Sequence, residues 1–352
     1  MGFMGDHGRE WRRTGSLSEP KNGDLLGIGE ETSGREGKPA FLGAPIERDW
    51  NRIAEYDAAI VGAPFDLGHS VRTGTRLGPL AIRKVSELYQ PFHYRTGIDL
   101  RERLRLCDIG DMAVCDSVQT SFDTITDAVS RLMRCGTMPI ILGGDHSIGY
   151  PCIRGIAENV EGNVGIIHLD RHLNIEASER DERMHTTPWF HATHIPNAPP
   201  GNLVQIGIGT WQVPHAGIHV SEERGTNVLT IHDVDELGIE KVAEMALEIA
   251  WKGASAVYLS FDLDSVDSGF APGARGAEPG GFLPREALRL MELVAREGLV
   301  GMEVAHVAPS CDLGDQTALL AARAILDVLA TMLHHNKLGG GKHAHSGRIS
   351  GR

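Results

Sequence analysis

His168-Leu169-Asp170-Arg171-His172-Leu173-Asn174 is the stretch that decides the fold of this chain. It follows an apolar run, and Asp170, His172 and Asn174 alternate along the chain as residues of a strand end do. The pattern Asp-x-His-x-Asp at the end of a strand binds divalent metal, but here an amide stands where the last carboxylate belongs. The stretch therefore predicts a metal-binding strand end that lacks one charged ligand.

Short apolar runs alternate with amphipathic stretches on both sides of this motif. The expected strands are residues 58–62, 104–108, 139–142, 164–169, 204–208, 228–231, 256–261 and 300–304. The expected helices are residues 79–89, 122–134, 239–251, 284–296 and 317–333. Most of the strands are continuous apolar runs, which is typical of parallel strands buried on both faces. The alternation predicts an α/β protein with a single three-layer αβα domain around a mostly parallel central sheet.

The two ends of the chain differ from the region between them. Residues 1–45 are rich in Gly, Glu and Arg without apolar periodicity, which predicts an N-terminal arm. Residues 46–336 contain the domain, and residues 337–352 form a flexible C-terminal tail of low apolar content. His343 and His345 in that tail are expected to be solvated rather than to bind metal.

Composition excludes several classes of protein. The chain has 352 residues, 41% of them hydrophobic, and a net charge of −13, so no basic stripe favours nucleic acid. No apolar run reaches the length of about 18 residues that a membrane span needs, and no signal peptide is apparent. The five cysteines are odd in number and without C-x-x-C spacing, which indicates reduced thiols. We therefore expect a cytoplasmic protein with no membrane or nucleic-acid partner.

Polar residues follow four of the expected strands directly. They are Asp145 and His146, the stretch Asp170 to Asn174, Asp262 with Asp264, and His306. In open α/β sheets, sites form outside the carboxyl ends of strands, so these side chains are expected to converge. A single such residue would usually cap a loop, whereas four strand ends together favour a site.

His and Asp side chains in this pattern suit divalent ions such as Mn²⁺ or Ni²⁺, with carboxylates bridging two ions. Two such ions close together lower the pKa of a shared water and give a hydroxide nucleophile at neutral pH. The segments that would supply the ligands are Gly143-Gly144-Asp145-His146-Ser147, Asp170-x-His172-x-Asn174 and Ser260-Phe261-Asp262-Leu263-Asp264.

With these motifs, the chain resembles the ureohydrolase superfamily of arginases, agmatinases, guanidinobutyrases and guanidine hydrolases. Further matching stretches are Gly62-Ala63-Pro64-Phe65-Asp66, Asp108-Ile109-Gly110-Asp111, Ala271-Pro272-Gly273 and Glu278-Pro279-Gly280-Gly281. Asp170-Arg171-His172, followed by residues 181–191, is closest in pattern to guanidine and metformin hydrolases, a branch that favours nickel. The resemblance implies an arginase-like αβα fold, a binuclear metal centre, and hydrolysis of a guanidinium compound to urea plus an amine.

The resemblance also assigns roles to particular residues. One ion would be held by His172, Asp170, Asp262 and Asp264, all of which are present. The other would be held by His146, Asp170, Asp262 and position 174, where Asn174 offers an uncharged amide oxygen. His185 matches the histidine that passes protons to the leaving amine, a role suited to imidazole. An interior histidine bonded to the backbone is the alternative interpretation of His185.

Two further departures lie downstream. His306 stands where the family has a glutamate that holds the substrate guanidinium, and imidazole makes no such paired contact with a cation. Strand alternation is expected to place Glu303 on the opposite face, so it would not compensate. Arg275 stands where the family has glycine, in a loop expected to border the pocket.

A charge count predicts reduced, single or absent metal occupancy. Four carboxylates balance two divalent ions, whereas Asp170, Asp262 and Asp264 leave two ions undercompensated by one unit. One ion would leave an excess negative charge that Arg275 or His306 could neutralise. We therefore hypothesise that Arg275, together with protonated His306, fills the pocket in place of a substrate.

Three functions are compatible with the sequence. The first is a catalytically impaired subunit that supports a paralogous catalytic ureohydrolase chain in a trimer or hexamer, as in a metformin hydrolase-like complex acting on a guanidine-type small molecule. The second is an active amidinohydrolase of the agmatinase or guanidinase type with an altered site. The third is a small-molecule binding protein on the scaffold of a former enzyme.

Overall fold

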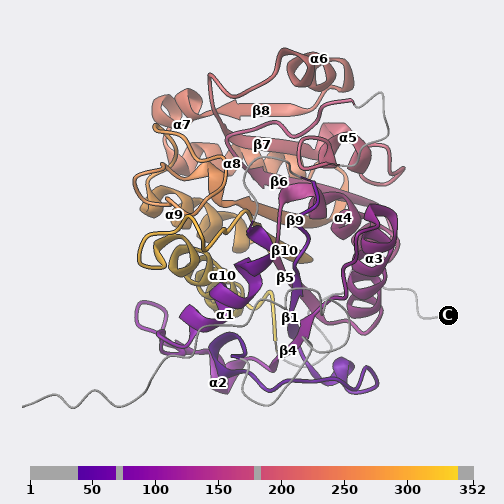
Figure 1. Ribbon diagram of the computed structural model, residues 1–352, viewed down its shortest axis with the longest axis vertical. Helices are drawn as coiled ribbons and strands as arrows, with labels where there is room; N and C mark the ends of the chain where they lie inside the picture. Colours follow the sequence, from indigo (N-terminus) through magenta and orange to yellow (C-terminus); the bar gives the residue numbers. More distant parts are fainter. Residues whose placement is uncertain (1–38, 69–73, 178–183, 340–352) are drawn as a thin grey trace, which may run out of the picture.

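An eight-stranded parallel sheet forms the centre of the molecule (Figure 1). The computed structural model describes residues 39–68, 74–177 and 184–339. From one edge to the other, the strands are β4 (Leu106–Asp111), β1 (Ala58–Ala63), β5 (Met138–Gly143), β10 (Gly301–Ala305), β9 (Ala254–Asp262), β6 (Asn163–Leu169), β7 (Leu203–Ile208) and β8 (Asn227–Thr230). Each neighbouring pair is parallel, which confirms the predicted α/β architecture with one central sheet.

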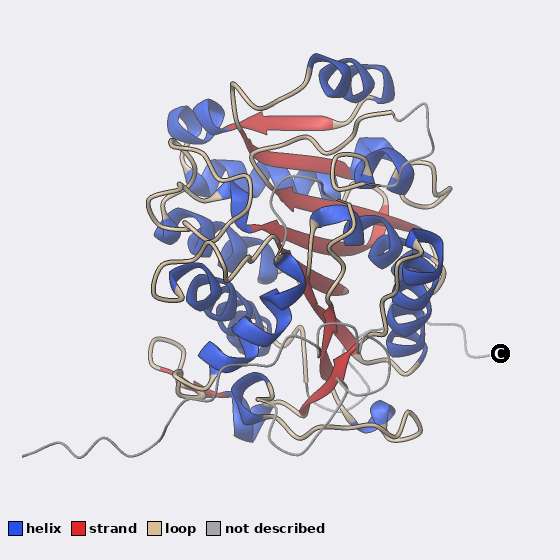
Figure 2. Cartoon of the chain, viewed as in Figure 1, coloured by secondary structure: helices blue, strands red, loops and turns tan. Residues whose placement is uncertain are grey.

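Helices cover both faces of this sheet (Figure 2). Packed on one another on one face are α3 (Val118–Arg134), α4 (Gly149–Ala157) and α5 (Pro188–Ala192). On the other face are α1 (Gly78–Ser86), α7 (Ile231–Leu237), α8 (Ile239–Ala250), α9 (Pro284–Ala295) and α10 (Gln316–His334). The outlying elements are α2 (Leu100–Arg103), α6 (His215–Arg224) and the short antiparallel pair β2 (Phe92–His93) and β3 (Ile98–Asp99).

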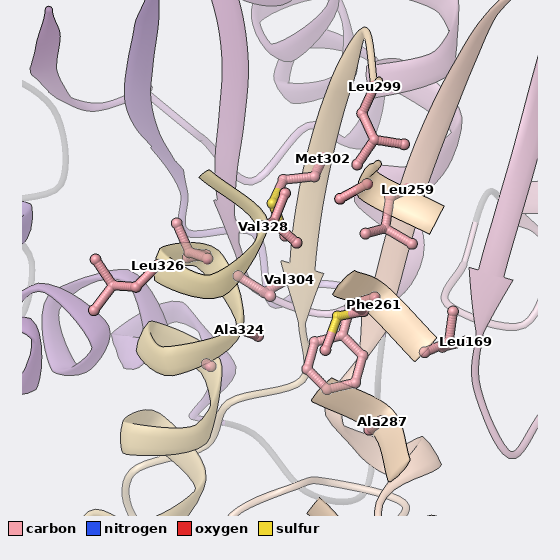
Figure 3. Packing of buried hydrophobic residues seen from close by; sticks show 14 of the residues in the cluster. Leu169, Leu259, Phe261, Ala287, Leu299, Met302, Val304, Ala324, Leu326 and Val328 are labelled. Atoms are coloured by element: carbon pink, nitrogen blue, oxygen red, sulfur yellow. The ribbon is translucent and has the colours of Figure 1, made fainter. Parts of the chain in front are cut away.

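The hydrophobic core has one part on each side of the sheet, because successive side chains of a strand point to opposite faces. In β5, Ile140 and Leu142 belong to the part under α1 and α8 to α10, whereas Ile141 belongs to the part under α3 and α4. Figure 3 shows Leu259, Phe261, Met302 and Val304 of β9 and β10 packed toward α9 and α10. Burial on both faces explains why these strands are continuous apolar runs in the sequence.

The helix α10 carries most of its apolar residues into this core. It is long and apolar enough to cross a membrane by length and composition, but 78% of the relevant window is buried within the domain. That burial identifies it as a core helix, and it is the one helix among the described residues that meets the length and composition criteria.

Residues before position 46 contribute to the domain where the structure describes them. Phe41 is fully buried, and its backbone N–H donates to Asp108 Oδ2 at 3.0 Å. Residues 1–38 of the predicted arm and residues 340–352 of the predicted tail, including His343 and His345, lie outside the described residues.

All eight predicted strands are present, and so are the five predicted helices, with bounds shifted by a few residues. The prediction that residues 228–231 form one strand was wrong at Ile231, which begins α7. Thr230 and Asp233 form a capping box there, in which each side chain accepts from the other residue's backbone N–H, so the strand ends at Thr230. The sequence also did not predict α4, whose Pro151, Gly149 and Gly155 argue against a helix.

Tertiary packing accounts for α4. A Cβ on Gly155 would lie 2.7 Å from the carbonyl oxygen of Thr126 in α3, so only glycine permits this close approach of the two helices. Pro151 lies in the first turn of α4, where its missing N–H costs little.

Candidate functional site

The four polar strand ends converge, because β5, β10, β9 and β6 are adjacent in the sheet. His146 follows β5, His306 follows β10, Asp262 ends β9, and Asp170 follows β6. All four side chains are almost fully buried. The structure thus brings together the residues that the sequence placed at four separate strand ends.

Asp170 lies at the centre of the first group of contacts. Its Oδ1 accepts from the backbone N–H of His172 at 3.0 Å and lies 3.2 Å from His172 Nδ1. Its Oδ2 accepts from Asn174 Nδ2 at 2.6 Å and lies 3.2 Å from His146 Nδ1. Two oxygens at 2.6 Å would repel, so the amide nitrogen of Asn174, rather than its oxygen, faces the carboxylate.

Asp262 and Asp264 form the second group. Asp262 Oδ1 accepts from the backbone N–H of Asp264 at 2.8 Å, and Asp262 Oδ2 lies 2.7 Å from His146 Nδ1. Asp264 Oδ1 accepts from the backbone N–H of Gly276 at 2.6 Å. A Cβ on Gly276 would lie 2.7 Å from Asp264 Oδ2, so this position requires glycine.

His306 turns its ring onto this carboxylate pair. Its Nδ1 lies 2.8 Å from Asp262 Oδ2 and 3.1 Å from Asp264 Oδ2. Its Nε2 lies 3.2 Å from the backbone nitrogen of His146 and accepts from that N–H when the ring is neutral, so the Nδ1 atom carries a proton in the neutral ring as well as in the charged one. Neither His306 Nδ1 nor Asp262 Oδ2 is aligned for a hydrogen bond, so their contact is a close electrostatic approach.

The backbone of His306 has φ 63°, in the left-handed region. Asn174 has φ 47°, and both residue types tolerate this region better than most. The left-handed turn ends strand alternation after Ala305, so the expected alternation does not set where His306 points. Glu303 nonetheless lies away from the carboxylate pair, fully buried behind His146, with its Oε1 3.6 Å from His146 Nε2.

The electrostatics of the site follow from opposite charges held in a buried volume. Burial opposes the charged form of His306, but the charges of Asp262 and Asp264 raise its pKa to about 10. Burial likewise opposes charge on His172, and the contact with Asp170 raises its pKa to about 9. Burial and the charge of Asp170 oppose ionisation of Asp262, but His306 and His146 hold its pKa down to about 2.

The donor set fits one divalent ion better than two. Asp170, His172 and Asp264 have ligand atoms close enough together to hold an ion, as the sequence predicted for the first position. At the second position, the amide of Asn174 presents N–H to Asp170, and His306 lies against Asp262 beside His146. Asn174 and His306 thus turn N–H groups toward the carboxylates there, although ligand atoms of His146, Asp262 and His306 lie close enough together to hold an ion.

A layer of residues that the sequence analysis missed holds the two buried histidines. Trp189 Nε1 donates to His168 Nε2 at 3.2 Å, and Gln205 Nε2 lies 3.1 Å from His168 Nδ1. Ser260 Oγ lies 2.9 Å from His146 Nε2 and donates to Glu303 at 2.8 Å. Such contacts fix the ring orientation of site histidines, and only the placement of Trp189 on α5, Gln205 on β7 and Ser260 on β9 reveals them.

A cavity of about 380 Å³ opens above the buried carboxylates. Its lining includes His172, Asn174, His185, Asp264, Arg275 and His306. Arg275 is only 6% exposed, and burial lowers the pKa of its guanidinium to about 10, so it stays charged at neutral pH. Arg275 therefore lies at the cavity, as the pocket-filling hypothesis requires.

His185 also lines the cavity, and its Nδ1 donates to the carbonyl oxygen of Gly68 at 2.5 Å. Burial, followed by the charge of His306, lowers the pKa of His185 to about 4. The ring is therefore neutral at pH 7, with a proton on Nδ1 and a lone pair on Nε2. This arrangement is compatible both with a proton-transfer role and with a backbone-bonded interior histidine.

We expect the imidazole of His185 to remain neutral down to about pH 4 in the folded chain. The physical reason is burial, which penalises the charged form. NMR titration of the ring protons, assigned with His185→Gln, checks the midpoint, and the urea-unfolded chain gives the reference near 6.5. A folded-state midpoint near 6.5 would contradict this prediction.

Arg171 links the strand end that carries Asp170 and His172 to the loop that contains Glu278 and Gly280. Its Nη2 lies 2.5 Å from Glu278 Oε1, and its Nη1 donates to the carbonyl oxygen of Gly280 at 3.0 Å. Arg171 itself is 3% exposed. The arginine between Asp170 and His172 thus holds the loop that borders the cavity, a role that the sequence pattern did not predict.

Comparison with known proteins gives the family. The model of the Arginase family matches residues 56–331. The proclavaminate amidinohydrolase of Streptomyces clavuligerus is 33% identical over 276 residues, covering 78% of this chain and 87% of that protein. The guanidinobutyrase of Pseudomonas aeruginosa is 31% identical over 279 residues, covering 78% of this chain and 86% of that protein.

Solved structures agree with this result. That of proclavaminate amidinohydrolase from Streptomyces clavuligerus has a TM-score of 0.77 at 31% identity, covering 84% of this chain and 97% of that one. A formiminoglutamase of Trypanosoma cruzi with Mn²⁺ has a TM-score of 0.75 at 20% identity, which shows the shared fold alone. With its parallel sheet, its strand-end His and Asp residues and these matches, the chain belongs to the arginase family of ureohydrolases.

Proposed function

We propose that this chain is a ureohydrolase-fold subunit of a heteromeric hydrolase that acts on guanidine derivatives of the metformin type. Catalysis is carried by a paralogous chain, and this chain supports the assembly as a trimer or hexamer in the cytoplasm. The observation that carries the proposal is His306, whose ring faces Asp262 and Asp264 at 2.8 and 3.1 Å. Position 306 itself therefore offers no carboxylate to hold a guanidinium substrate.

Arg275 supports the same proposal. Its buried cation lines the 380 Å³ cavity, where a cationic substrate would meet a charge of the same sign. Like charges in a volume of low dielectric repel strongly, so a guanidinium compound binds poorly beside Arg275. His306 and Arg275, from two different segments of the fold, thus both disfavour the binding of a guanidinium compound.

An active amidinohydrolase with an altered site is the second candidate. Asp170, His172 and Asp264 favour it, since they keep ligand atoms for one divalent ion. A Mn²⁺ or Ni²⁺ ion held by these residues would supply an activated water as the nucleophile for a guanidinium substrate. In that case His185, at the cavity wall, would be placed to pass a proton to the departing amine.

Urea release separates the two candidates. The purified chain, loaded with Ni²⁺ or Mn²⁺, is expected to release no urea from guanidine, metformin or agmatine. Co-expression with a paralogous catalytic chain is expected to give activity that survives Asp262→Ala in this chain. Urea release by this chain alone, abolished by Asp262→Ala, would overturn the proposal in favour of the second candidate.

A further inference from the structure

Two of the three residues that depart from the family's pattern, Asn174 and His306, place side-chain N–H groups beside the buried carboxylates of the site. Asn174 Nδ2 donates to Asp170 Oδ2 at 2.6 Å. His306 Nδ1 lies 2.8 Å from Asp262 Oδ2 and 3.1 Å from Asp264 Oδ2. These three oxygens belong to the carboxylates that the family pattern assigns to metal.

The remaining oxygens of the three carboxylates meet backbone N–H groups. Asp170 Oδ1 accepts from His172 at 3.0 Å, and Asp262 Oδ1 accepts from Asp264 at 2.8 Å. Asp264 Oδ1 accepts from Gly276 at 2.6 Å. Every oxygen of Asp170, Asp262 and Asp264 therefore has a nitrogen of this chain within 3.1 Å.

Buried carboxylates are destabilising unless they are paired, and a metal ion is one way to pair them. We propose that Asn174 and His306 together replace the second metal ion as the link between these carboxylates, so that the site folds and persists without that ion. The inference deepens the proposed non-catalytic function and rests on it, because a site released from catalysis no longer needs two ions.

One competing arrangement uses the same atoms. His146, Asp262 and His306 have ligand atoms close enough to hold a single ion, with His306 itself as a ligand. Against it, the backbone N–H of His146 faces His306 Nε2, so in the neutral ring as in the charged one the proton lies on the Nδ1 atom that would have to bind metal. The experiment must therefore separate a histidine that replaces an ion from a histidine that binds one.

The test measures how far stability depends on metal. The full-length chain is dialysed against EDTA or reloaded with Ni²⁺ or Mn²⁺, its metal content is measured by plasma mass spectrometry, and its Tm is measured by calorimetry. The wild-type chain is expected to hold no more than one ion, and its Tm is expected to fall in EDTA by no more than the loss of that one ion accounts for. His306→Ala is expected to lose several degrees in EDTA and to recover them when metal is added.

Two further variants control for a general loss of packing. His306→Asn keeps an N–H donor close to the Nδ1 position and tolerates the left-handed backbone, so its Tm is expected to respond to metal no more strongly than the wild-type Tm does. His93→Ala removes the histidine of a separate His93, Glu292 and Asp327 group, whose carboxylates are paired with Arg95 and Arg323. It is expected to change neither metal content nor the response to EDTA.

Three results would overturn the inference. They are two ions in the wild-type chain, a wild-type Tm that falls in EDTA by more than the loss of one ion accounts for, and loss of a bound ion in His306→Ala, which would make His306 a ligand. Urea is assayed on the same samples. A wild-type stability that depends on a second ion, without urea release, would overturn this inference and leave the proposed function intact, whereas urea release by this chain alone would overturn the proposed function.

Discussion

The double variant Asn174→Asp/His306→Glu is expected to depend on divalent metal for its stability more strongly than the wild-type chain does. The substitutions remove both N–H donors and add two carboxylates beside Asp170, Asp262 and Asp264, all almost fully buried. Like charges in a buried site destabilise the fold until a cation neutralises them. Metal at a hundredfold excess over its Kd then stabilises the variant by about 2.7 kcal/mol for each ion bound.

Thermal unfolding in EDTA and in Mn²⁺ or Ni²⁺ checks this prediction, together with the number of ions bound. The matched control is Asn51→Asp, which adds negative charge at an exposed position and should leave the response to metal unchanged. A double variant with the same Tm in EDTA and in metal would show that Asn174 and His306 do not determine the metal requirement.

Arg171→Ala is expected to lower the free energy of unfolding by about 3–5 kcal/mol, because it leaves a largely buried carboxylate without its partner. The guanidinium is 3% exposed and contacts Glu278 Oε1 at 2.5 Å, with further bonds to the carbonyl oxygens of Gly207 and Gly280. Denaturant unfolding measures the loss. The free energy of unfolding of Arg171→Lys should lie between those of the wild-type chain and of Arg171→Ala, since an ammonium does not reproduce the planar, multiply bonded contact of the guanidinium.

The control for this prediction is Lys241→Ala. Lys241 pairs with Glu244 at 2.9 Å, but its side chain is 52% exposed, and such pairs contribute about 0–1 kcal/mol. If Arg171→Ala and Lys241→Ala have equal effects, the buried contact does not stabilise the loop at the cavity.

The sequence predicted the sheet more completely than the helices. Strands such as β5 and β9 are buried on both faces, so each is a continuous apolar run that can be recognised without knowledge of its neighbours. The helix α4 could not be recognised in this way. Its glycines and proline are unfavourable locally, and only the close packing of Gly155 on α3 makes them favourable.

The candidate site likewise contains some residues that the sequence predicted and others that it did not. Asp170, His172, Asp262 and Asp264 were predicted from spacing, because a parallel sheet brings the carboxyl ends of its strands to one edge. The supporting residues Trp189, Gln205 and Ser260 were not predicted, since their contacts join segments far apart in the chain. Their residue types alone gave no signal.

By itself, the sequence determined the family and the departures at positions 174, 275 and 306. Residue identity and spacing fix which chemical groups reach the strand ends, and an amide or imidazole differs in kind from a carboxylate. Only the tertiary structure decided what those groups do there. The left-handed backbone at Asn174 and His306 turns their N–H groups onto Asp170, Asp262 and Asp264, and this direction depends on the packing of four adjacent strands.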